Sequence, residues 1–191
     1  MALLRMREAR FSNPDAGVGP VTLDLAAGER TALCCASARE AAILALLASG
    51  IVKASSGCVL IDDYDPKMQA VACKRVAALV PHEPFALDES EFARYIAYRA
   101  ALWRIEPSRA RAHAEMLRKR LHGMHDAFAY PLIAALVVMP KLVVLDRPPP
   151  AYAPQILDAV GRRAIFSTHV DAQAARAFAP GSLGTLRIVG R

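Results

Sequence analysis

One segment, ALCCASAREAAILALLASG from Ala32 to Gly50, constrains the fold of this chain more than any other. Its apolar start is typical of a buried strand, a turn of small residues follows, and an apolar run of helical length comes next. A strand that enters a helix through a tight turn is the frame of a phosphate-binding loop. Between Leu33 and Ile43, however, the turn has neither glycine nor lysine, and Ser37 supplies its only hydroxyl. The segment therefore predicts the frame of a phosphate loop without the groups that bind phosphate.

The rest of the chain alternates between strand-like and helix-like runs. Two strand-like runs, LVVL and AIFS, show no polar alternation, which is typical of buried parallel strands. A β-rich start followed by strand–helix repeats indicates an α/β fold with an antiparallel edge. We expect strands at residues 3–9, 21–25, 30–35, 58–61, 76–80, 141–145, 164–167 and 185–189, and helices at residues 38–49, 66–74, 126–138, 155–161 and 171–178.

Length and composition favour one globular domain. The 191 residues are 54% hydrophobic and 22% charged, which supports a core and argues against disorder. We predict a single domain over residues 1–191, with a helical subregion at about 88–138. The start MALLRMREARF mixes charges with apolar residues, unlike a signal peptide, and no apolar run reaches the roughly 20 residues of a membrane helix. Four cysteines without CxxC spacing indicate reduced thiols of a cytosolic protein.

The positive charge is concentrated in one segment. The chain carries +6, and residues 90–120 hold eight basic side chains against three acidic ones. This segment predicts two amphipathic helices, with Pro107 at the start of the second. The basic face fits three interpretations: a solvated surface, a docking face for an acidic partner or anionic lipid, and a nucleic-acid surface. The expected apolar faces are Phe92, Tyr95, Ile96, Leu102 and Trp103 in the first helix, and Ala110, Ala114, Leu117 and Leu121 in the second.

Several motifs follow the opening segment along the chain, in the order SGCVLIDDYDP, VALVPHEP, LHGMH, PKLVVLDRP and AIFSTHV. This order resembles the nucleotide-binding domain of ATP-binding-cassette (ABC) transporters. VALVPHEP is similar to the Q-loop strand of that family, and LHGMH lies where the LSGGQ signature belongs. PKLVVLDRP resembles the Walker B strand, and AIFSTHV resembles the switch-histidine strand. The resemblance implies a P-loop NTPase-like three-layer sandwich with an antiparallel β edge and a shortened helical subdomain.

The same resemblance implies a degenerate phosphate loop. Glu40 falls on the family's lysine and Ala41 on its magnesium-binding hydroxyl, while side chains replace the glycines that let backbone N–H groups approach phosphate. A lysine–phosphate attraction of about 4 kcal/mol, at about 4 Å and an effective dielectric of about 20, becomes a repulsion. We therefore expect neither ATP nor magnesium as a cofactor. The loop positions are Cys34, Cys35, Ala36, Ser37, Ala38, Arg39, Glu40, Ala41 and Ala42.

Other site positions of the resembled family are partly retained. Asp146 falls on the Walker B aspartate, but Arg147 replaces the glutamate that acts as general base, and an arginine stays protonated. His82 falls on the Q-loop glutamine and His169 on the switch histidine. Phe11 is a candidate for stacking on adenine, with a core aromatic as the alternative. LHGMH keeps part of the signature, PPPAYAP replaces the D-loop, and the HxxH spacing lacks a third ligand, so no metal site is predicted.

These observations predict a non-catalytic or regulatory subunit, a pseudo-ATPase, as the function. It would dock a membrane permease or an intact ABC ATPase, in a possible dimer, at the inner face of the membrane from the cytoplasm. One alternative is a genuine ATP-hydrolysing transporter subunit with unusual site chemistry, which would need ATP and magnesium. A second alternative is a basic cytosolic scaffold or a module that binds nucleic acid, a partner the sequence favours least.

Two structural expectations follow for the loop. The strands around residues 33–35, 142–145 and 165–167 should be adjacent and parallel, with the following helix packed on them. The resemblance also places Glu40 and Arg147 on opposite sides of the phosphate position. We therefore expect Arg147, or failing that Arg39, to form an ion pair with Glu40 that closes the loop.

Overall fold

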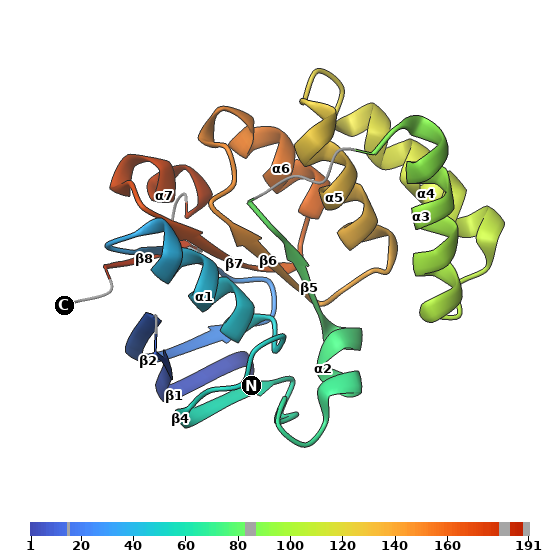
Figure 1. Cartoon of the computed structure of the whole chain (residues 1–191). Coiled ribbons are helices and arrows are strands. Elements are labelled where there is room, and N and C mark those ends of the chain that lie inside the picture. The colour runs from blue at the N-terminus through green and yellow to red at the C-terminus, as the bar shows by residue number, and fades with distance from the viewer. Residues whose placement is uncertain (15, 83–86, 180–183, 189–191) are drawn as a thin grey trace.

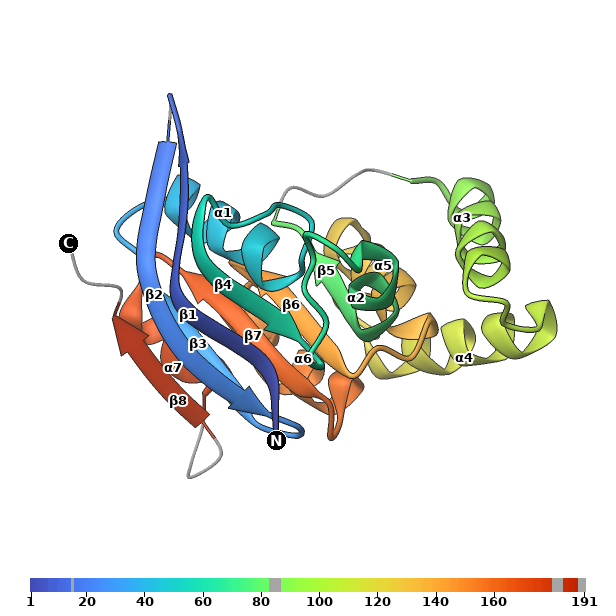
Figure 2. The ribbon, with the colours of Figure 1, turned by 90° about the horizontal axis from the view of Figure 1, so that it is seen from below.

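Two β-sheets form the framework of the protein (Figures 1 and 2). The structure is a computed structural model that describes residues 1–14, 16–82, 87–179 and 184–188, with the backbone alone at residues 126 and 184–188. In the smaller sheet, β1 (Ala2–Asn13) pairs antiparallel with β2 (Ala16–Ala26) and β4 (Ser56–Ile61). The larger sheet is parallel, in the order β5 (Ala77–Val80), β6 (Leu142–Asp146), β7 (Ala164–His169), β3 (Arg30–Cys34) and β8 (Gly184–Ile188).

Helix α1 (Ala38–Ala48) lies between the two sheets, as Figure 1 shows. Leu44 and Leu47 are fully buried in one core with side chains of both sheets, and half-buried Ile43 packs against that core. Leu46 is also half-buried. Strands β6, β7 and β3 are neighbours in the parallel sheet. The predicted adjacency of these strands and the packing of the loop helix against them are therefore confirmed.

A second core covers the opposite face of the parallel sheet. It is built by α5 (Asp126–Val137), α6 (Ala153–Val160) and α7 (Ala172–Phe178), with a 3-10 turn at Pro150–Tyr152 before α6. The strand β6 reads as a continuous apolar run because helices cover both of its faces. The α/β architecture expected from the sequence is confirmed.

The helical subregion extends to one side of the sheet, where α3 (Glu89–Leu102) and α4 (Pro107–Arg120) lie (Figure 2). The predicted apolar face of α4 is confirmed, because all four of its residues are buried. The predicted face of α3 is wrong at Leu102, which is 51% exposed. The buried stripe runs at intervals of four residues from Phe92 through Ile96 to Ala100, and Leu102 lies on another face of the helix.

Helix α2 (Ala70–Val76) begins later than the expected start at residue 66. The carbonyl and carboxylate of Asp65 accept hydrogen bonds from the amides of Lys67, Met68 and Gln69, which holds the preceding residues in a turn. In the described parts of the chain, no helix combines the length and the apolar character that crossing a bilayer requires.

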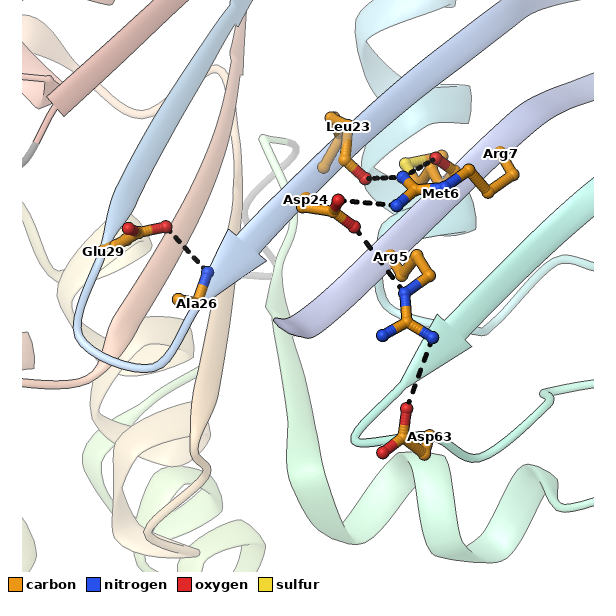
Figure 3. A network of polar contacts seen from close by, with 8 residues as sticks. All are labelled: Arg5, Met6, Arg7, Leu23, Asp24, Ala26, Glu29 and Asp63. Atoms are coloured by element: carbon orange, nitrogen blue, oxygen red, sulfur yellow. Dashed lines mark hydrogen bonds and ion pairs between the residues drawn. The ribbon is translucent and has the colours of Figure 1, made fainter. Parts of the chain in front are cut away.

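Ion pairs connect the strands on the polar face of the antiparallel sheet (Figure 3). The carboxylate of Asp24 in β2 lies 2.6 Å from Arg7 Nη2 and 3.7 Å from Arg5 Nε in β1. Arg5 also lies 3.6 Å from Asp63, which follows β4. These side chains remain between 34% and 49% exposed, so solvent screens the pairs and their stabilisation is small.

Candidate functional site

The turn between β3 and α1 is the segment for which the sequence predicts the frame of a phosphate loop. Ser37 is the N-cap of α1, and its hydroxyl accepts the amide of Glu40 at 3.1 Å. The amide of Cys35 donates to the carbonyl of His169 at 2.7 Å, which ties the turn to the end of β7. Residues 34–42, all of them described, adopt no positive φ angle, so the loop needs no glycine.

The carboxylate of Glu40 closes this loop from within. Its Oε2 accepts the backbone amide of Ala36 at 2.9 Å, and the residue stands in the first turn of α1, where the helix dipole favours a negative charge. The expected ion pair with Arg147 or Arg39 is wrong, because no ion pair of Glu40 occurs within the described ranges. The carboxylate of Glu40 meets a backbone amide four residues earlier in the chain instead.

The guanidinium of Arg147 instead neutralises its neighbour Asp146. Arg147 Nε and Nη2 donate to the two carboxylate oxygens of Asp146 at 3.0 and 3.2 Å. The hydroxyl of Thr168 donates to Asp146 Oδ1 at 3.2 Å. The side chains of Asp146 and Arg147 are 8% and 18% exposed, so this is a largely buried, two-pronged pair. The carboxylate of Asp146 is therefore already engaged by groups of this chain.

The backbone of Arg147 fixes this arrangement. Its φ angle is 45°, its amide donates to Thr168 O at 2.9 Å, and its carbonyl accepts the Nδ1–H of His82 at 3.0 Å. Since a carbonyl only accepts, the proton of the His82 contact is on Nδ1. The structure thus brings His82, Asp146 and Arg147 together at the carboxyl ends of β5 and β6.

His169 lies at the end of β7 and is buried, with 2% of its surface exposed. Its Nε2 is 2.9 Å from Ser167 Oγ, and its ring centroid is 5.3 Å from that of Phe178. Burial lowers the pKa of His169 to about 4, against the opposing charges of Asp171 and Asp146. The imidazole is therefore uncharged at neutral pH, and it contacts Ser167 and Phe178 inside the protein.

The adjacent cysteines of the loop remain free thiols. Burial, followed by the negative charges of Glu40 and Cys34, raises the pKa of Cys35 to about 12. The Cys35 thiol points toward the carbonyl of Leu33, at 3.9 Å. Because the thiolate is the reactive form, Cys35 behaves as a small core residue.

The remaining predicted positions lie in structural roles. Phe11 of β1 is opposite Val18 of β2 and packs half-buried against the core around α1. His125, in the signature segment, is the N-cap of α5 through its Nδ1, which accepts the amide of Ala127 at 3.2 Å. Gly123 has a φ angle of 81° in the turn before it. The segment in place of the D-loop forms the 3-10 turn.

A groove beside the edge strand β5 is a second candidate surface. It has a volume of about 410 Å³ and lies between the end of α1, the strand and α3. Arg99 stacks over the ring of Trp103 at 4.8 Å, but the buried atoms Arg99 Nε and Trp103 Nε1 have no hydrogen-bond partner within the described residues. Buried donors without acceptors are costly, so a partner that supplies acceptors would be favoured here. The lining residues are Ser49, Ile51, Lys74, Ala77, Ala78, Leu79, Arg99 and Trp103.

Sequence reasoning missed three features of these sites. Thr168 contacts Asp146, Ser167 contacts His169, and Arg99 stacks on Trp103. The first two stand in the run STH at the end of a predicted strand, and the polar character of that run was the available signal. Arg99 and Trp103 are four residues apart on a predicted helix, which places them on one face.

The residues at the loop do not fit a magnesium-bound triphosphate. The amide of Ala36 already donates to a carboxylate, a second negative group would meet Glu40, and the carboxylate of Asp146 is held by Arg147. Binding would have to break both contacts and bring like charges together.

Comparisons with known proteins place the fold. No family model matches the sequence, and no curated protein does. An ATP-binding subunit of an ABC transporter superposes with a TM-score of 0.76 at 17% identity, over 98% of this chain and 85% of that one. Clostridium perfringens cbiO1, part of the ABC transporter complex cbiONQ, superposes with a TM-score of 0.69 at 18% identity, over 93% of this chain and 82% of that one. A nucleotide-free ATP-binding cassette from an ABC transporter superposes with a TM-score of 0.67 at 14% identity, over 99% of this chain and 88% of that one. The chain therefore has the fold of the nucleotide-binding domains of ABC transporters.

Proposed function

We propose that this protein is a non-catalytic subunit with the ABC nucleotide-binding fold, which serves as a structural or regulatory partner in a transport assembly. The observation that carries the proposal is that Glu40 and Asp146 are both engaged by groups of the chain itself. Glu40 accepts the loop amide of Ala36, and Arg147 neutralises Asp146. The chain supplies both the anion and the cation that a nucleotide complex would otherwise bring.

The side chains at this position are unsuited to activating water. Arg147 stands where a base would be needed and stays protonated. The imidazole of His169 is hydrogen-bonded to Ser167, and because it is buried it is not available to contact a phosphate from solution. A fixed subunit does not need these reactions, and the closed loop holds the turn into α1 without ligand.

Nucleotide binding tests this proposal directly. Calorimetric titration with ATP and magnesium at millimolar concentration should give no saturable binding, and ATP turnover should equal a buffer blank. A ligand present at about 100 times its Kd would stabilise the folded protein by about 2.7 kcal/mol. An upward shift of several degrees in the melting temperature on adding ATP and magnesium would therefore contradict the proposal.

The groove beside β5 is the proposed docking site for the partner, a permease or an intact ATPase of the assembly. The partner segment would carry carboxylate or carbonyl oxygens for the Arg99 guanidinium, which lines the groove, and apolar side chains for Ile51, which is 52% exposed. A permease or ATPase encoded next to this chain is the partner to co-express with it.

Two variants of α3 test the docking site in that co-expression. Arg99→Ala should weaken co-purification about tenfold or more, because it removes a charged donor from the groove. Arg94→Ala removes the same charge from an exposed position of α3 that does not line the groove, and it should leave binding unchanged. Equal effects of the two variants would count against the groove.

A further inference from the structure

A pocket lies at the amino-terminal ends of the parallel strands, at the opposite end of the sheet from Asp146 and His169. It has a volume of about 250 Å³. Its walls come from α4, from the end of α5 and from the connections that precede β6 and β7. The lining residues are Ile105, Arg109, His113, Val137, Met139 and Arg163.

Three of these side chains are basic and none is acidic. Arg109 and His113 are four residues apart on α4 and therefore share one face, while Arg163 reaches the pocket from the connection before β7. Neither arginine forms an ion pair with any residue that the structure describes. The nearby carboxylate of Glu106 is used at the start of α4, where it accepts the amides of Ser108 and Arg109.

Two of the three basic side chains, His113 and Arg163, are partly withdrawn from water, whereas Arg109 is exposed. Burial lowers the pKa of Arg163, whose Nη1 donates to the carbonyl of Val160 at 2.8 Å. Burial also lowers the pKa of His113, followed by the positive charge of Arg163 and then those of Arg109 and Arg120 on its own helix. A hydrogen bond to the carbonyl of Val137 opposes this shift.

The guanidinium of Arg163 is half-buried without a counter-charge among the described residues, which is costly, and an anion from solution would remove that cost. We propose that this pocket binds a small oxyanion, namely a phosphate group, which Arg109, His113 and Arg163 would hold together. The guanidinium groups suit phosphate oxygens, because their donors form a planar fork. The apolar wall of Ile105, Val137 and Met139 would contact the organic part of a phosphate ester. This site is separate from the closed loop, so the proposal does not depend on the proposed function.

Calorimetry with two probes, inorganic phosphate and phenyl phosphate, tests the site at fixed ionic strength. Both should bind, and phenyl phosphate should bind more tightly if the natural ligand is an ester that uses the apolar wall. Equal affinities would identify the free anion as the ligand of the same site. No binding of either probe at about 10 mM, where a usable anion site would be saturated, would overturn the proposal.

Variants at neighbouring arginines separate a site from general electrostatic attraction. Arg163→Gln should weaken phosphate binding about tenfold, because it removes a charge-assisted donor. Arg162→Gln removes the same charge from the adjacent exposed residue, which does not line this pocket, and it should leave the affinity unchanged. Equal losses in the two variants would overturn the proposal. If Arg163→Gln does not fold, Arg109→Gln gives the same comparison.

The titration of His113 supplies a test on the unaltered protein. NMR of the imidazole, assigned by its loss in His113→Gln, should show its protonation midpoint move upward when sulfate is added, because a bound dianion favours the imidazolium. Sulfate does not change its own charge in this range, so its affinity should rise as pH falls through that midpoint. A midpoint that does not respond to sulfate would show that the anion does not bind beside His113 and would overturn the proposal.

Discussion

Replacement of Arg147 by methionine tests how much the largely buried pair with Asp146 contributes to the stability of the fold. The change leaves a carboxylate that is 8% exposed with Thr168 as its remaining side-chain donor. Removing one partner of a buried ion pair costs roughly 3–5 kcal/mol. Because Arg147 is itself 18% exposed and water can reach the space it leaves, we expect a loss of about 2–3 kcal/mol in the free energy of unfolding. For a chain of this length that is a fall of about 5–10 °C in melting temperature.

Urea unfolding followed by circular dichroism at pH 7 measures this loss. The matched variants are Asp146→Asn and the double variant Asp146→Asn with Arg147→Met. If the pair is the reason for the loss, the double variant is more stable than Arg147→Met alone, because no buried charge is left without a partner. A loss below about 0.5 kcal/mol in Arg147→Met, or a double variant whose loss equals the sum of the single losses, would refute the reasoning.

Three further predictions concern the same region. The imidazole of His169 has a pKa of about 4 in the folded protein and about 6.5 in the unfolded chain, so the unfolded chain binds the proton first as the pH falls. The free energy of unfolding should therefore fall by about 3 kcal/mol between pH 6.5 and pH 4. Urea unfolding across this range should show the fall in the wild type and not in His169→Gln. Ser37→Ala removes the N-cap of α1 and should lower the free energy of unfolding by about 1 kcal/mol in the same assay, whereas Ser12→Ala, at an exposed strand position, should not. In mass-spectrometric thiol labelling at pH 8, half-buried Cys34 should react in the folded protein and Cys35 only after unfolding, and native labelling of Cys35 would contradict its environment.

The framework could be predicted because its signals are local and repeated. Uninterrupted apolar runs predicted β6 and β7, since both faces of these strands are covered. The spacing of Ala110, Ala114 and Leu117 predicted the buried face of α4, and Pro107 predicted its start. Such patterns depend on periodicity, which the chain carries without reference to its tertiary contacts.

The contacts of the site could not be predicted in the same way. The sequence predicts that Glu40 lies at the start of a helix and that Arg147 follows a strand, and the structure agrees. It does not predict which group each side chain contacts. Arg147 has a φ angle of 45°, a conformation uncommon for arginine, and its side chain contacts the residue beside it. Glu40 meets a backbone amide, which every loop offers and no residue type reveals.

Glu40 and Arg147 each find a partner within a few residues of their own position, a backbone amide for Glu40 and the carboxylate of Asp146 for Arg147. The ion pair that we expected between them would have made each residue depend on the other for its partner. In the structure, Glu40 is accommodated by the turn that contains it, and Arg147 by the strand end that contains Asp146. Either residue alone therefore leaves a satisfied local structure, since neither depends on the other for its partner. The fold keeps its strand-to-helix turn for the same reason that a phosphate loop binds phosphate: exposed amides at a helix start favour an anion, and here the chain provides one.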